Sequence, residues 1–252
     1  MRTLALLRTF IAAAVFALPF AVSAQQITVS AAASLTDAFR ELGMKFEASR
    51  PGATVRLNFA ASGVLLQQIA QGAPVDVFAS ADQETMDRAA AQKLIHIATR
   101  KNFAANTVVL IEPAQGGVGI KTLQDLAGAQ VKKIAIGKIA TVPVGRYTKL
   151  ALDGANLWST LAPKFVQADS ARQVLDYVAR GEVEAGFVYR TDATVMGNKV
   201  KVVLSPGGAA AVSYPIAVVA DSRQPALARD FLAFVAGDAG QQTLARFGFG
   251  KP

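Results

Sequence analysis

The stretch "SAAASLTDAFREL", residues 30–42, is the part of the sequence that decides the fold. A short apolar run at 27–29 leads into small residues at 31–34, and a helical pattern begins at Ser34. The apolar residues that recur at helical spacing are Leu35, Phe39, Leu42 and Phe46. A strand that ends in such small residues leaves room for another group to approach the backbone at the start of the helix.

The alternation of strand and helix patterns continues along the chain. Short β-branched runs predict strands at 26–30, 54–59, 75–79, 107–111, 133–136, 164–167, 185–189, 200–204 and 214–219. Longer amphipathic runs predict helices at 34–48, 63–71, 83–92, 122–127, 144–153, 171–180, 225–236 and 238–246. This alternation is typical of an α/β fold with mostly parallel sheets.

Residues 1–24 have the pattern of a secretory signal peptide. Two arginines accompany an apolar stretch at 10–22, and small residues at 23–24 precede the expected cleavage site. An uncleaved membrane anchor is the alternative, but the apolar stretch is short for a span and contains Pro19. Because the chain has no cysteine, it has neither disulfides nor a thiol for lipidation. We therefore expect a free, exported protein of the periplasm.

The charged residues favour a small anion over a nucleic acid as the ligand. The chain carries 26 lysines and arginines against 18 acidic residues, but the positive charges are scattered. A protein that binds nucleic acid usually gathers them in a patch with aromatic residues. A modest positive field still attracts small anions.

Four predicted helix starts share a composition of Ser, Ala, Gly and Pro, at Ser34, Ser62, Pro143 and Ala171. A helix start presents unpaired N–H groups and the positive end of the peptide dipoles, so it favours an anion. The alternative is that Ser34 and Ser62 are ordinary N-caps, since Ser34 and Asp37 have the spacing of a capping box.

The sequence lacks the usual residues of a catalytic centre. The single histidine, His96, lies in "KLIHIATR", where a lone histidine is more often structural, and no GxSxG motif appears, so we do not expect a Ser-His-Asp triad. With one histidine and no cysteine, a transition-metal cation site lacks its usual ligands. A secreted hydrolase with Ser34 or Ser62 as nucleophile is the alternative from a different class, and it has no obvious base. We expect a binding protein rather than an enzyme, without a cofactor.

Five segments in order resemble the periplasmic molybdate-binding proteins of ABC importers. They are "ITVSAAASLTDAF", "NFAASGVLLQQIAQGAPVDVFASAD", "VPVGRY", "ADSARQVLDYVARGEVEAGFVYRTDA" and "YPIAVV". The resemblance implies a type II periplasmic binding protein of two α/β lobes, each a mixed sheet flanked by helices. The implied lobes are 25–104 plus 217–252, and 105–216, with chain crossings near 104–106 and 214–217.

The resemblance also implies a ligand and the residues that hold it. Molybdate or tungstate would be bound between the lobes and delivered to an inner-membrane permease, by a protein that acts as a monomer. Another tetrahedral oxyanion, such as sulfate, is the alternative ligand. The implied donors are the hydroxyls of Ser34, Ser62 and Tyr189 and the backbone N–H groups of Val144 and Ala171.

Three arginines, Arg146, Arg172 and Arg190, follow implied ligand residues by one or two positions. We expect them to face solvent; the alternative is that they help to draw the anion into the cleft.

Overall fold

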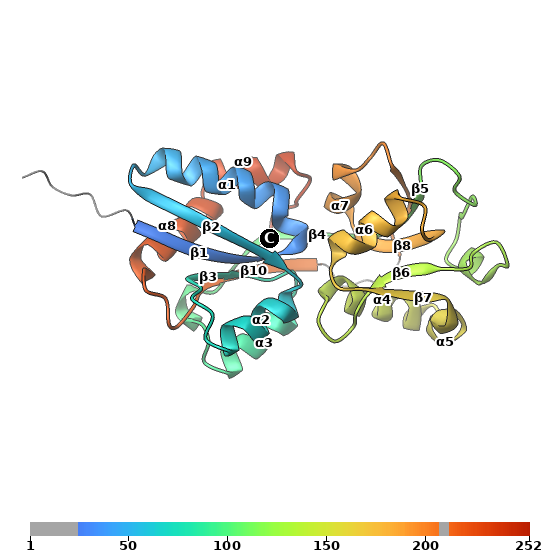
Figure 1. Ribbon diagram of the computed structural model, residues 1–252, viewed down its shortest axis with the longest axis horizontal. Helices are drawn as coiled ribbons and strands as arrows, with labels where there is room; N and C mark the ends of the chain where they lie inside the picture. Colours follow the sequence, from blue (N-terminus) through green and yellow to red (C-terminus); the bar gives the residue numbers. More distant parts are fainter. Residues whose placement is uncertain (1–24, 207–211) are drawn as a thin grey trace, which may run out of the picture.

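The computed structural model describes residues 25–206 and 212–252, so the predicted signal peptide lies outside the described residues. Its two five-stranded sheets lie side by side along the longest axis of the molecule (Figure 1). Each sheet is covered by helices, which confirms the predicted two-lobed α/β architecture with mixed sheets.

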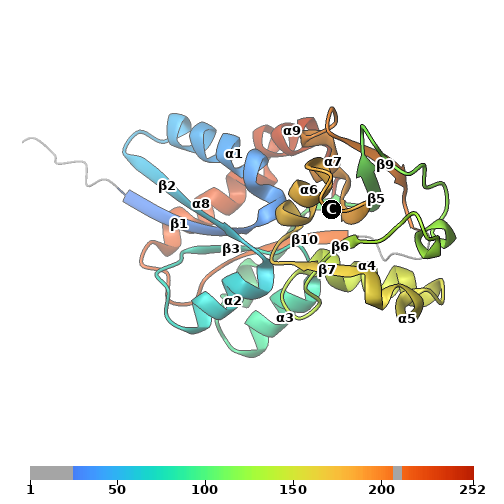
Figure 2. The same ribbon diagram turned by 45° about the vertical axis from the view of Figure 1, so that its right-hand side comes forward.

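The first sheet has the strand order β2-β1-β3-β10-β4. Its strands are β1 (Gln25–Ala32), β2 (Ala53–Ala60), β3 (Val77–Ala79), β4 (Lys101–Asn106) and β10 (Val212–Val218). Figures 1 and 2 show one face covered by α1 (Thr36–Ser49), α8 (Pro225–Ala236) and α9 (Asp238–Arg246). The other face is covered by α2 (Ser62–Ala70) and α3 (Gln83–Ala91).

The second sheet has the order β7-β6-β8-β5-β9. Its strands are β5 (Val108–Pro113), β6 (Ile134–Gly137), β7 (Phe165–Ala168), β8 (Ala185–Tyr189) and β9 (Val200–Leu204). One face is covered by α4 (Pro143–Gly154) and α5 (Trp158–Leu161), and the other by α6 (Ala171–Ala179) and α7 (Arg190–Val195). Short 3₁₀ turns are η1 (Ala33–Leu35), η2 (Ile97–Thr99), η3 (Gln124–Ala127) and η4 (Ala162–Lys164).

The prediction of mostly parallel sheets is wrong, because each sheet combines parallel and antiparallel pairs. In the first sheet β1 pairs in parallel with β2 and β3, whereas β10 is antiparallel to β3 and β4. In the second sheet β5 is antiparallel to both β8 and β9. Strand β4 leads the chain out of the first sheet and β10 leads it back alongside, so the two must run in opposite directions.

The sequence pattern misses β4, α5 and α7, and it predicts an α-helix where η3 lies. Strand β4 was not expected because its sequence, KNFAAN, is poor in β-branched residues, and its pairing with β10 supplies the missing preference. The helices α5 and α7 are short and lack a full amphipathic repeat. The helix predicted at 122–127 is the 3₁₀ turn η3.

The lobe boundaries inferred from the resemblance stay a prediction. What the structure gives is the membership of the strands: β4 belongs to the first sheet up to Asn106, and β5 begins the second at Val108. Within residues 25–206 and 212–252, no helix combines the length and the apolar character needed to cross a membrane.

The core packs around the residues that the helical spacing of the opening stretch predicts to be buried. Phe39, Leu42 and Phe46 on α1 are all at most 1% exposed. The ring centroid of Phe46 lies 5.2 Å from that of Phe231 on α8 in an edge-to-face arrangement. This packing fixes α1 on the first sheet and hence the position of the turn η1 before it.

The start of α4 is fixed by close packing against β6. A Cβ atom on Gly145 would lie 2.1 Å from the carbonyl oxygen of Gly137, the last residue of β6. Only glycine therefore allows the first turn of α4 to approach the strand this closely.

Substitution of Gly145 by alanine is expected to lower the free energy of unfolding by about 1–3 kcal/mol, because the backbone of β6 must move. The matched control is Gly154→Ala in the same helix, where an added Cβ meets nothing within 4 Å. Urea denaturation followed by circular dichroism measures both, and equal midpoints for the two variants would contradict this packing argument.

Candidate functional site

The five residues that the sequence implicates line one small cavity between the two sheets. Ser34 lies in η1 and Ser62 begins α2, both beside the first sheet. Val144 and Ala171 begin α4 and α6, and Tyr189 ends β8, all beside the second sheet. The other lining residues are small or apolar: Ala32, Ala33, Ala61, Ala81, Val142 and Pro143.

The two backbone donors lie at the starts of helices that point toward the cavity. Val144 follows Pro143, the first residue of α4, and Ala171 is the first residue of α6. N–H groups in these positions have no partner within the helix. The side chain of Ser170 caps α6 by accepting a hydrogen bond from the Gln173 N–H at 3.1 Å, so it leaves the Ala171 N–H available.

The interpretation of Ser34 and Ser62 as N-caps is wrong, since neither makes a capping hydrogen bond. The Ser34 Oγ lies 3.0 Å from the hydroxyl oxygen of Tyr214, a residue of β10. The Ser62 Oγ accepts a hydrogen bond from the Ala81 N–H at 3.0 Å. Ser62 can therefore still donate its own hydroxyl hydrogen, and the cavity is the space in front of it.

Tyr189 brings a buried hydroxyl group to the cavity. Its side chain is 1% exposed, and its hydroxyl has no hydrogen-bond partner within the described part of the chain. Burial raises the pKa of this phenol well above its usual value, so the hydroxyl keeps its hydrogen. A buried donor without an acceptor is costly, and a ligand with a free lone pair would remove that cost.

The cavity is narrow and electrically neutral. The space open to the centre of a water-sized sphere is about 10 Å³, which is about enough for one water molecule. None of the described residues that line it carries a formal charge. All the lining residues are buried, so the walls must move apart for an anion to enter from solvent.

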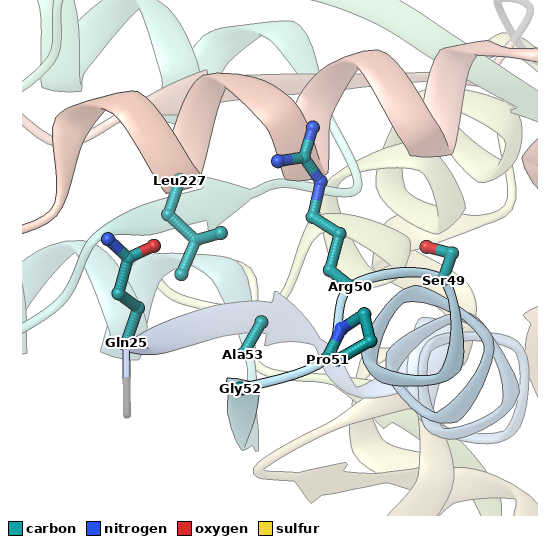
Figure 3. A pocket seen from close by; sticks show the side chains of 7 residues that line it. All are labelled: Gln25, Ser49, Arg50, Pro51, Gly52, Ala53 and Leu227. Atoms are coloured by element: carbon teal, nitrogen blue, oxygen red, sulfur yellow. The ribbon is translucent and has the colours of Figure 1, made fainter. Parts of the chain in front are cut away.

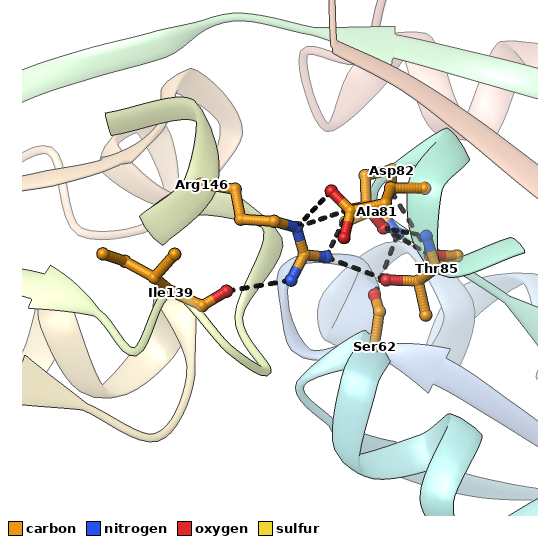
Figure 4. A network of polar contacts seen from close by, with 8 residues as sticks. Ser62, Ala81, Asp82, Thr85, Ile139 and Arg146 are labelled. Carbon is orange, nitrogen blue, oxygen red and sulfur yellow. Dashed lines mark hydrogen bonds and ion pairs between the residues drawn. The ribbon is translucent and has the colours of Figure 1, made fainter. Parts of the chain in front are cut away.

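Arg146 does not face solvent, contrary to our expectation. Its side chain is 13% exposed and reaches from α4 to the start of α3, where its Nε lies 3.1 Å from Asp82 Oδ2 (Figure 4). Its Nη2 also donates to Thr85 Oγ1 at 2.8 Å. Asp82 follows Ala81, whose N–H holds Ser62, so this ion pair lies directly behind one wall of the cavity.

Arg172 forms a second ion pair between the sheets, so the expectation of a solvent-facing side chain is wrong here too. Its Nη2 lies 2.7 Å from Asp37 Oδ2 on α1 and 3.8 Å from Asp192 Oδ1 on α7. Arg190 is exposed and donates to Ser205 Oγ at 2.7 Å, away from the cavity.

Backbone contact also joins the two halves. The Gly63 N–H in α2 donates to the carbonyl oxygen of Thr141, in the loop before α4, at 2.9 Å. A Cβ on Gly63 would lie 2.7 Å from that oxygen and 2.8 Å from the Thr141 Cα. The glycine in "AASG" thus permits the close approach of the two walls.

A wider hollow lies at the opposite end of β1. Its volume is about 680 Å³, and its lining comes from the end of α1, the turn after it and α8 (Figure 3). Arg50, its charged lining residue, already pairs with Asp230 at 2.8 Å. It shares no lining residue with the cavity between the sheets and presents no buried polar group without a partner.

The structure gives the hydrolase alternative no support. His96 is exposed and does not line the cavity that contains Ser34 and Ser62. In the described ranges 25–206 and 212–252, no cluster of three or more His, Cys, Asp or Glu side chains could hold a metal cation.

Asp192 is a buried acidic residue that the sequence analysis does not single out. Neither carboxylate oxygen has a hydrogen-bond partner among the described residues, and burial raises its pKa to about 6 although Arg172 acts in the opposite sense. Between its usual pKa and this value the folded protein binds a proton more tightly than the unfolded chain. The contribution of Asp192 to stability is therefore lost as the pH rises through this interval.

We expect Asp192→Asn to gain stability over the native protein as the pH rises from about 4 to about 7, by about 3 kcal/mol at most. Urea denaturation at several pH values measures the difference. Asp153→Asn, at an exposed pair with Lys149, is the control and should show no such trend. A native-minus-variant difference that stays constant with pH would contradict the assignment.

Comparison with known proteins shows the family of this chain. The family model of the bacterial extracellular solute-binding proteins matches residues 27–250. The molybdate-binding protein ModA of Mycobacterium tuberculosis strain H37Rv is 39% identical over 230 residues, which cover 91% of this chain and 86% of that protein. This similarity confirms the resemblance drawn from the sequence.

Two solved structures share the fold. The periplasmic molybdate-binding protein of Azotobacter vinelandii has a TM-score of 0.77 at 22% identity, covering 90% of this chain and 99% of that one. The sulfate-binding protein SubI of M. tuberculosis has a TM-score of 0.82 at 19% identity, covering 89% and 86%. With two mixed sheets, an interposed cavity of neutral donors and a family match over nearly its full described length, the chain belongs to the bacterial extracellular solute-binding proteins.

Proposed function

We propose that this protein binds molybdate, and also tungstate, between its two lobes and delivers it to the permease of an ABC importer. The observation that carries the proposal is the buried Tyr189 hydroxyl, which has no acceptor within the described residues and lines one cavity with Ser34, Ser62, Val144 and Ala171. The molybdate-binding relatives support the choice of ligand.

The proposed site works without a buried counter-ion. Each hydrogen bond to a charged group contributes about 1.5–3 kcal/mol net of the water contact that it replaces, so five together can bind a dianion without a counter-ion. Ser62 accepts a hydrogen bond from the Ala81 N–H and keeps its own hydrogen for the anion. Such a site favours an oxyanion that carries no hydrogen of its own.

Sulfate is the second candidate ligand, because it has the same charge and shape as molybdate. The likeness to the sulfate-binding protein supports the fold alone, since the identity is 19%. Sulfate is smaller than molybdate, so the size of the closed cavity would decide between them. Calorimetric titration with molybdate, tungstate and sulfate separates these possibilities.

Lobe movement would admit the ligand. In this proposal the first lobe, 25–104 plus 217–252, and the second, 105–216, rotate about the two crossings and close on the anion. The pairs Arg146–Asp82 and Arg172–Asp37 join the lobes on either side of the cavity and would form as it closes. We place the protein in the periplasm as a monomer after removal of residues 1–24.

Removal of a single donor should weaken molybdate binding at least several-fold. Ser34→Ala, Ser62→Ala and Tyr189→Phe each delete one hydroxyl and leave the fold nearly unchanged, and the lost hydrogen bond to a charged group accounts for the effect. Isothermal titration calorimetry gives the affinities. Unchanged affinity in all three variants would refute the site.

Gly63→Ala should weaken molybdate binding at least ten-fold and leave the stability of the ligand-free protein within about 1 kcal/mol, because the added Cβ meets Thr141 of the opposite lobe. Gly43→Ala is the control, since a Cβ there makes only ordinary contacts at 3.6 Å or more. If both variants bind molybdate like the native protein, the Gly63–Thr141 contact is not part of the closed site.

A further inference from the structure

Ser34 differs from Ser62 in that its hydrogen-bonded partner is another hydroxyl. A serine hydroxyl can donate or accept, so the 3.0 Å contact between Ser34 Oγ and the Tyr214 hydroxyl leaves two directions open. The direction decides what Ser34 presents to the cavity. If Tyr214 donates, Ser34 keeps its own hydrogen for the cavity; if Ser34 donates to Tyr214, it has only lone pairs left to offer.

Asn106 at the end of β4 resolves the direction. Its side-chain oxygen accepts a hydrogen bond from the Thr107 N–H at 2.9 Å, which fixes the amide nitrogen on the opposite side. That nitrogen donates to Thr191 Oγ1 at 2.9 Å and to the Tyr214 hydroxyl at 3.3 Å. Both hydrogens of the amide are thereby used, and Tyr214 is the acceptor in its contact with Asn106.

Tyr214 must then donate to Ser34. Its side chain is 0% exposed, so water cannot take the phenol hydrogen. Burial raises the pKa of the phenol well above its usual value, so that hydrogen is retained. Within the described residues Ser34 Oγ is the remaining partner at hydrogen-bond distance. Ser34 accepts from Tyr214 and has its own hydrogen left for the cavity.

We propose that Tyr214, oriented by Asn106, is a positioning residue that keeps the Ser34 hydrogen directed to the cavity and so disfavours oxyanions that carry a hydrogen. The inference rests on the proposed function and deepens it. Hydrogenphosphate brings an O–H that needs an acceptor, and a site whose hydroxyls all donate leaves that O–H unpaired and buried. Sulfate and molybdate present lone pairs alone.

The first test removes the phenol hydroxyl. Tyr214→Phe keeps the ring and should weaken molybdate binding about five- to ten-fold, because Ser34 is no longer held as a donor. In the Ser34→Ala background the same change should have no further effect, since Tyr214 acts through Ser34. Tyr177→Phe, which deletes a phenol hydroxyl bonded to Gln173 outside the site, should leave binding unchanged.

The second test reverses the chain of hydrogen bonds. Asn106→Asp replaces the amide donor by an acceptor, so Tyr214 would donate to the aspartate and accept from Ser34. Ser34 would then present a lone pair to the cavity. The added charge weakens every dianion alike, so the readout is the ratio of sulfate to hydrogenphosphate affinity at about pH 8, measured by displacement of molybdate. We expect this ratio to fall at least ten-fold.

Two results would overturn the inference while molybdate binding by the native protein stands. One is a Tyr214→Phe effect that simply adds to that of Ser34→Ala, which would indicate a general structural role. The other is a sulfate-to-hydrogenphosphate ratio that Asn106→Asp leaves unchanged in a protein with a native circular dichroism spectrum. If the native protein binds neither molybdate nor tungstate nor sulfate, the proposed function and this inference are both overturned.

Discussion

A buried hydrogen-bond donor needs an acceptor, and within the described residues a donor at the centre of this molecule, the Tyr189 hydroxyl, lacks one. The Tyr189 hydroxyl has no partner within the described residues, and the first N–H groups of α4 and α6 lie at the same cavity. The strands and helices that surround it place these groups at the edge where the two sheets meet. Leaving such groups unpaired costs free energy, so the architecture favours an occupant rich in lone pairs.

The charges of the site lie behind its walls rather than inside it. Arg146 pairs with Asp82 and Arg172 with Asp37, each across the two sheets, while the cavity lining is neutral. Glycine at position 63 lets the backbones of the two halves come within hydrogen-bond distance. The ion pairs therefore join the two halves, and the lining of the cavity presents N–H and O–H groups in place of charges.

Much of the fold was predictable because its signals are local. The predicted strands at 185–189 and 200–204 and the helices at 225–236 and 238–246 match the structure, since their apolar spacing and end residues lie within each segment. Strand β4 was not predicted because its extended conformation is stabilised by pairing with β10, over 100 residues away in the sequence. The antiparallel pairs were not predicted for a similar reason. The direction of a strand depends on how the chain crosses between the sheets, and the periodicity of the sequence does not encode that.

The sequence by itself determined which residues could serve as donors, because a strand that runs into small residues and a helix start is a local arrangement. The resemblance grouped Ser34, Ser62, Val144, Ala171 and Tyr189, and the cavity contains all of them. Only the tertiary structure decided what each side chain bonds to. Ser34 contacts Tyr214, which is 180 positions away in the sequence, and Arg146 contacts Asp82, which is 64 positions away. The N-cap predicted for Ser34 and the solvent exposure predicted for Arg146 are wrong because only the folded chain brings these partners together.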